Sequence, residues 1–171
     1  MATMTIDLGL AQRLRADLAQ RPEEVGFFLA DYNAERNHFV LREWRFIEEA
    51  EVASRGTGHV VLADEMRGAL IRWASSAGRV LVEAHSHGPR GIAGFSTSDL
   101  IGFQEWVPHV RWRLQGRPYA AIVLAGEHVD AMAWIDGSRA VEPIDHIEVL
   151  GGEPIVPTGN TLEYLRRAGH G

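Results

Sequence analysis

Apolar positions follow two different periods along the chain and predict a mixture of helices and strands. Near the start, leucines spaced as on one helix face predict a helix over residues 7–20 that ends before Pro22. The same spacing predicts helices over 63–77 and 97–114. Short apolar and β-branched runs between these segments predict strands at 25–32, 38–46, 59–62, 80–87, 119–124, 130–136 and 144–150.

This order of elements favours an α/β protein, with two or three helices flanking a mixed, partly antiparallel central sheet in an α-β-α sandwich. The strands at 25–32 and 38–46 are close enough in sequence to form an antiparallel hairpin. We expect one catalytic domain over residues 1–150. Residues 151–171 are rich in Gly and Pro and are expected to form a C-terminal extension that packs on the domain.

Composition agrees with a single small domain, since 171 residues with 46% hydrophobic content can bury one sizeable core. The net charge of −6 argues against nucleic acid or an anionic membrane as the main partner. No apolar run is long enough for a bilayer span, and the first residues lack a signal-peptide layout, so we expect a cytoplasmic protein. With no cysteine in the chain, a metal site must use histidine and carboxylate ligands.

Three candidate metal ligands lie between residues 83 and 99. His85 and His87 end an apolar strand and are two residues apart, so both imidazoles should point to one face. Asp99 falls in the first turn of the helix that begins after Ser96. Two imidazoles and one carboxylate leave a fourth tetrahedral position for water, as in catalytic zinc sites.

A second interpretation needs no metal. Ser96 followed three residues later by Asp99 is close to the capping-box pattern of helix starts. The two interpretations are compatible, because Ser96 can cap the helix while Asp99 binds a metal ion.

Together with Glu23, these residues resemble the motif of the JAMM metalloproteases, also called MPN-plus or JAB domains. That motif has an upstream Glu, then His-Ser/Thr-His-Pro, then a short loop and Ser-x-x-Asp. Here it reads Glu23, His85-Ser86-His87 and Ser96-Thr97-Ser98-Asp99. The family's Glu usually precedes a glycine by three positions, as Glu23 precedes Gly26, so Glu23 is preferred over Glu24. The resemblance implies a JAB/MPN-type, cytidine-deaminase-like sandwich.

Two features depart from the family motif. The proline after the second His is displaced to Pro89, and eight residues, not the usual seven, separate His87 from Ser96. Glu83 stands where the family often has an aromatic or apolar residue. It could orient a histidine, compete for the role of general base or pair with an arginine.

The resemblance implies one Zn²⁺ per chain with a bound water, Glu23 as general base and Ser96 as oxyanion donor. The implied function is an isopeptidase or protease that acts at the C-terminal glycine of a bacterial ubiquitin-like protein. Standalone bacterial members of the family accompany E1-like and E2-like proteins, some of them in antiphage defence operons. Two alternatives stay open: a hydrolase releasing an amino acid from a sulfur-carrier protein, and a non-catalytic MPN scaffold. Residues 48–58 are the predicted substrate-contacting loop.

Overall fold

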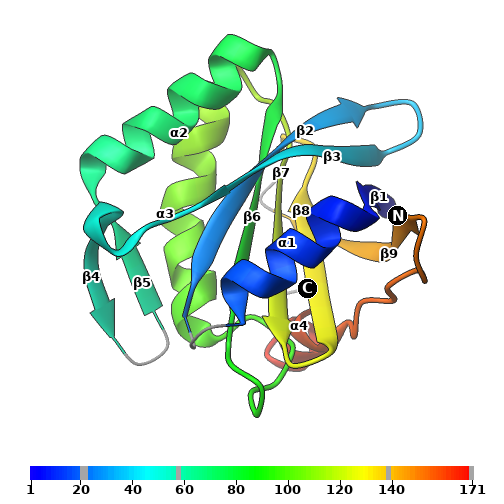
Figure 1. Ribbon diagram of the computed structural model, residues 1–171. Coiled ribbons are helices and arrows are strands. Elements are labelled where there is room, and N and C mark those ends of the chain that lie inside the picture. Colours follow the sequence, from blue (N-terminus) through cyan, green and yellow to red (C-terminus); the bar gives the residue numbers. More distant parts are fainter. Residues whose placement is uncertain (20–22, 57–58, 138–139, 170–171) are drawn as a thin grey trace.

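The computed structural model describes residues 1–19, 23–56, 59–137 and 140–169 (Figure 1). The expected stop at Pro22 and the last two residues of the 48–58 loop lie outside this range. Seven strands close into a barrel. Around the barrel they are β1 (Ala2–Asp7), β3 (His38–Phe46), β2 (Val25–Asn33), β6 (Val80–Ser86), β7 (Tyr119–Ala125), β8 (His128–Trp134) and β9 (Glu142–Leu150), after which β1 follows again.

The predicted α-β-α sandwich, and with it the JAB/MPN-type fold, is wrong, because the sheet is a closed barrel. The closing element is β1, for which no strand was predicted. It pairs in parallel with β3 on one side and with β9 on the other, so that Met4 lies opposite both Phe39 and Ile147. A strand that joins both edges of an open sheet removes those edges.

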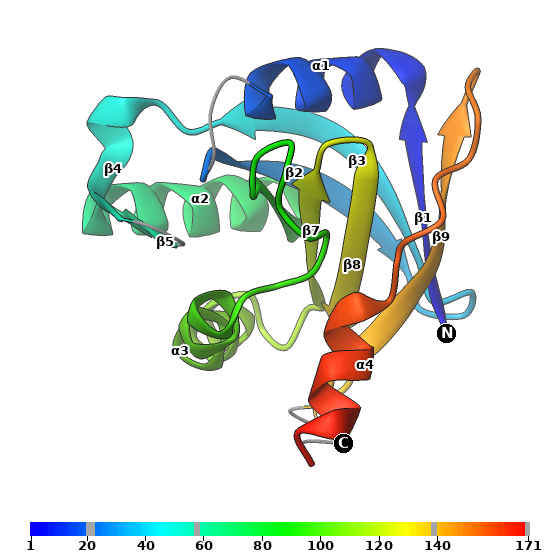
Figure 2. The ribbon, with the colours of Figure 1, turned by 90° about the horizontal axis from the view of Figure 1, so that it is seen from below.

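In the part of the chain that the structure describes, four α-helices and a small hairpin surround the barrel. Helix α1 (Leu8–Leu18) follows β1, α2 (Asp64–Ala77) and α3 (Thr97–Arg113) flank β6 in sequence, and α4 (Asn160–Arg167) ends the described chain. A 3-10 turn (Glu49–Glu51) leads into β4 (Val52–Gly56) and β5 (His59–Leu62), so most of the predicted 48–58 loop is regular structure. Helices α2 and α3 lie on one side of the barrel and α1 on another (Figure 2). None of the described helices has both the length and the apolar character needed to cross a membrane.

Two apolar cores divide the side chains of the barrel strands. The inner core takes residues from all seven strands and from α1, among them Met4, Phe28 and Val82. The outer core joins β2, β6 and β7 to α2 and α3, with Phe27, Leu81 and others. Strand β6 contributes to both cores, and its residues of odd number face the helices. His85 therefore points to the side where α3 begins.

The residues after β9 fold back onto the barrel. Ile155 exchanges two backbone hydrogen bonds with Ile147, of 2.8 and 2.9 Å, and forms an isolated bridge to β9. The chain then continues across β8 into α4, and the backbone N–H of Thr158 donates to the carbonyl of Val129 at 2.8 Å. Residues 155–161 thus pack on the barrel.

Candidate metal centre

The end of β6 and the first turn of α3 bring His85, His87 and Asp99 together. Their facing atoms form a triangle: Nε2 to Nε2 3.2 Å, His87 Nε2 to Asp99 Oδ2 3.2 Å and His85 Nε2 to Asp99 Oδ2 3.5 Å. Ligands about 2.0–2.1 Å from a tetrahedral zinc ion stand roughly 3.3–3.4 Å apart. The triangle therefore has the size of one face of a zinc tetrahedron. Among the described residues, these three form the group whose ligand atoms lie close enough together to hold one metal ion.

Strand pairing fixes both histidines. His85 lies opposite Val25 of β2 and Val123 of β7. The backbone N–H of His87 donates to the carbonyl of Leu124 at 2.8 Å and so continues the pairing with β7 one residue beyond β6. The alternation of side chains in an extended strand then puts both rings on the α3 side.

Helix capping orients Asp99. Its Oδ2 accepts from the backbone N–H and from the hydroxyl of Ser96, both at 2.7 Å, and its own N–H donates to the Ser96 Oγ at 3.2 Å. These bonds make a capping box in which the N3 residue is Asp99. The capping interpretation therefore holds, and the cap itself turns the carboxylate toward the histidines.

The outer nitrogens of both rings have acceptors. His85 Nδ1 lies 3.5 Å from Glu83 Oε1, and His87 Nδ1 lies 3.3 Å from the carbonyl of Ile92. Glu83 in turn accepts from the hydroxyl of Tyr119 at 2.7 Å. Partners of this kind on Nδ1 leave Nε2 available to a metal ion. Of the three predicted roles for Glu83, the contacts favour that of orienting a histidine.

The electrostatics of this cluster hold a proton on His85 in the metal-free protein. Burial opposes a charge on the ring, but hydrogen bonds to Asp99 and Glu83 outweigh it and raise the pKa of His85 to about 10. Burial likewise opposes the Asp99 charge, while the bonds to His85 and His87 hold the pKa of that carboxyl far below its usual range. Burial and the Glu83 charge raise the pKa of Tyr119, so the phenol keeps its proton and donates.

Metal affinity should consequently rise with pH. A ligating imidazole must be neutral, so a metal ion displaces the His85 proton at every pH below the pKa of about 10. We expect the dissociation constant for Co²⁺ to fall roughly tenfold per pH unit between about pH 6.5 and pH 8.5. Titrations followed by cobalt absorption measure this slope. A dissociation constant independent of pH would contradict a protonated His85.

Glu23 lies beside this centre, next to the end of β6. Its backbone N–H donates to the carbonyl of Ser86 at 2.7 Å. The backbone N–H of Ser86 donates in turn to the carbonyl of Glu24 at 3.0 Å, so Glu23 and Glu24 both lie opposite Ser86, as in a β-bulge. Its φ of 63° is in the left-handed region, which is rare for a residue other than glycine. Backbone strain of this kind concentrates at functional sites.

Glu24 lies between Glu23 and the start of β2. It is 2% exposed and has the alternation of Phe28 and Ala30, which belong to the core inside the barrel. Close packing explains why residue 26 is a glycine, because a Cβ there would lie 2.3 Å from the ring of Trp44.

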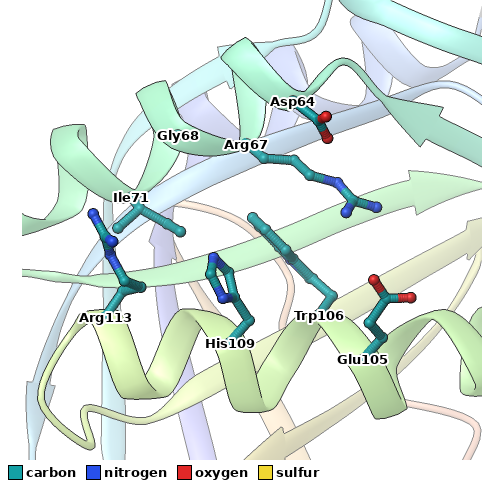
Figure 3. Close-up of a pocket in the computed structure, with 8 residues that line it drawn as sticks. All are labelled: Asp64, Arg67, Gly68, Ile71, Glu105, Trp106, His109 and Arg113. Carbon is teal, nitrogen blue, oxygen red and sulfur yellow. The ribbon is translucent and has the colours of Figure 1, made fainter.

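A groove lies between α2 and α3, and its lining includes none of the three candidate ligands (Figure 3). It has a volume of about 410 Å³, and its lining includes Arg67, Trp106, His109 and Arg113. The Arg67 guanidinium lies 5.5 Å from the centre of the Trp106 ring. The Trp106 Nε1–H donates to the hydroxyl of Tyr119 at 2.9 Å. Hydrogen bonds from Trp106 through Tyr119 to Glu83 thus connect the groove to the metal centre.

Comparisons with known proteins concern the fold. No protein-family model and no curated protein matches the sequence. A solution structure from Desulfitobacterium hafniense aligns over 86% of this chain and 95% of its own, with a TM-score of 0.50 and 9% identity. Another from Salinibacter ruber aligns over 90% and 95%, with a TM-score of 0.46 and 18% identity. The likeness to the Desulfitobacterium hafniense structure supports the overall fold and gives no information on function.

Proposed function

We propose that this protein is a zinc-dependent hydrolase that cleaves the amide bond after the C-terminal glycine of a ubiquitin-like protein. The observation that carries the proposal is the triangle of His85 Nε2, His87 Nε2 and Asp99 Oδ2, with edges of 3.2, 3.2 and 3.5 Å. Two imidazoles and one carboxylate are a donor set that zinc accepts, and three protein ligands are typical of catalytic rather than structural zinc sites.

A zinc ion held by these residues would supply a Lewis acid and bring the pKa of a bound water close to neutral. Glu23 is the proposed general base. Its backbone is hydrogen-bonded to Ser86, between the two histidines, and a carboxylate within hydrogen-bond reach of the attacking water can take its proton and later deliver it to the leaving amine. The strained backbone of Glu23, with φ 63°, supports this role.

Ser96 is the proposed oxyanion donor. Its hydroxyl now donates to Asp99 Oδ2, which also accepts the Ser96 backbone N–H. The same oxygen also faces the Nε2 atoms of both histidines, so a metal ion bound there would compete with these bonds. A Ser96 hydroxyl displaced from Oδ2 would donate to the negative oxygen that forms as the amide carbonyl is attacked.

The burial of the centre supports an extended glycine tail as substrate. The side chains of His85, His87 and Asp99 are 6%, 12% and 10% exposed. A folded surface cannot reach ligands enclosed to this degree, whereas a glycine-ended strand has no side chain to obstruct it. The choice of a ubiquitin-like protein rests on the motif shared with the JAMM enzymes. E1-like and E2-like partners, a cytoplasmic location and a role in antiphage defence belong to the same proposal.

The test combines metal content with cleavage. Purified protein is assayed for zinc and then incubated with fusions of candidate ubiquitin-like proteins to a reporter, with and without a chelator. We expect one zinc ion per chain and chelator-sensitive cleavage, which is lost when the terminal glycine of the fusion is replaced by valine. Zinc without cleavage of any fusion would contradict the substrate, and a chain that takes up no zinc after reconstitution would contradict the enzyme and favour a scaffold.

A further inference from the structure

The loop of residues 88–95 connects the two halves of the metal centre. It leaves His87 at the end of β6 and returns at Ser96, which caps the helix carrying Asp99. The carbonyl of Ile92 faces His87 Nδ1, and the ring of Phe95 packs edge-on against His85 with centres 5.5 Å apart. The path of this loop therefore sets the orientation of both histidine rings.

The C-terminal segment holds this loop by its backbone. Thr158 Oγ1 and Asn160 Nδ2 both donate to the carbonyl of Ala93, at 2.8 and 2.9 Å. Thr161 Oγ1 accepts from the backbone N–H of Phe95 at 2.9 Å. The two chains approach so closely that a Cβ on Gly94 would lie 3.2 Å from that of Asn160.

Asp130 anchors the segment to the barrel. This residue of β8 is 2% exposed, and its carboxylate accepts from the backbone N–H groups of Gly159 and Thr161 at 2.8 and 2.9 Å. The Thr161 hydroxyl also donates to it, at 2.5 Å. Because the same hydroxyl accepts from Phe95, a continuous hydrogen-bonded path runs from β8 through Thr161 to the loop.

We propose that Thr161 is a positioning residue of the metal centre, acting with Asp130 through the 88–95 loop. The inference rests on the proposed function, since it concerns the same centre. Thr161 is 2% exposed and lies 66 residues beyond Phe95 in sequence, so nothing in the local motif requires it. Residues 158–161 thus complete the centre, although the motif ends at Asp99.

The experiment compares Thr161→Val with Thr161→Ser and with Thr5→Val as a matched control. Thr5 of β1 is also buried, at 7% exposure, and its hydroxyl bonds to His38 of β3 and to Glu148 of β9. Each protein is titrated with Co²⁺, and its cobalt absorption spectrum and the amide exchange of Phe95 are recorded. We expect Thr161→Val to weaken Co²⁺ binding about 10–100-fold, with an altered spectrum and faster exchange at Phe95.

Thr161→Ser keeps the hydroxyl and should restore the wild-type affinity and spectrum, while Thr5→Val should leave both unchanged. Wild-type affinity and spectrum in Thr161→Val would overturn the inference and leave the proposed function standing. Absence of Co²⁺ binding in the wild-type protein would overturn both.

A second variant covers the case in which Thr161→Val does not fold. Thr158 and Asn160 are exposed, so Thr158→Val combined with Asn160→Ala removes both bonds to Ala93 without leaving a buried carboxylate unpaired. It should weaken Co²⁺ binding severalfold. Unchanged binding in this variant would also overturn the inference.

Discussion

Replacing Glu23 by glutamine should lower the turnover number by about 10²- to 10⁴-fold while zinc content stays at one ion per chain. The amide has nearly the size of the carboxylate but cannot accept the proton of the attacking water at neutral pH. Glu23 is not one of the three ligands, so the metal should remain. Single-turnover cleavage of a fusion substrate and elemental analysis of the same preparation measure the two quantities.

Glu24→Gln is the matched control for this variant. It makes the same change one residue later, at a side chain that is 2% exposed and shares the alternation of the core inside the barrel. We expect this variant to keep its turnover, with thermal melting used to check that it is folded. Full activity in Glu23→Gln would contradict the assignment of the base, and loss of activity only in Glu24→Gln would transfer the role to Glu24.

The parts of the centre that could be predicted from the sequence are those that depend on local geometry. His85 and His87 are two residues apart on a strand, so strand alternation points both side chains to one face. Ser96 and Asp99 are three residues apart at a helix start, so the capping box fixes how their side chains lie. Strand β3 and helix α3 likewise follow from local periodicity, and the structure begins both at the predicted residues.

The barrel could not be predicted in this way because its closure depends on distant partners. Ala2, Met4 and Ile6 face the inner core, and Thr3 and Thr5 alternate with them, so the strand pattern of β1 is present in the sequence. It is short, and the stronger helical signal after Asp7 follows at once. Nothing within residues 2–7 indicates that this strand pairs with both β3 and β9.

The same reason explains the supporting residues that the motif does not show. Tyr119 reaches Glu83 across 36 residues because β7 pairs in parallel with β6. Thr161 reaches Phe95 across 66 residues because the C-terminal segment folds back over β8. Neither contact has a spacing that a sequence motif can express, so the residues that orient the ligands become visible only in the folded chain.

Loss of a ligand should lower the affinity for the metal ion, and not the turnover number alone. We expect His85→Ala to weaken Co²⁺ and Zn²⁺ binding by more than about a hundredfold, since two protein ligands would remain of a three-ligand set. Asp99→Asn should weaken binding to a similar degree, because a neutral amide is a poor ligand for zinc. Its oxygen can still accept the Ser96 N–H and so keep the cap of α3. Competition with a chromophoric chelator measures both affinities.

The control for these variants is His109→Ala, which removes an imidazole from the groove between α2 and α3 and should leave metal binding unchanged. Asp99→Asn has a second consequence in the metal-free protein. The bond to Asp99 is the largest influence that raises the pKa of His85, so this pKa should fall from about 10 when the carboxylate is lost. Proton NMR titration follows that change without any metal. Wild-type zinc affinity in His85→Ala would contradict the proposed centre, whereas an unchanged His85 pKa in Asp99→Asn would contradict the contact on which its geometry depends.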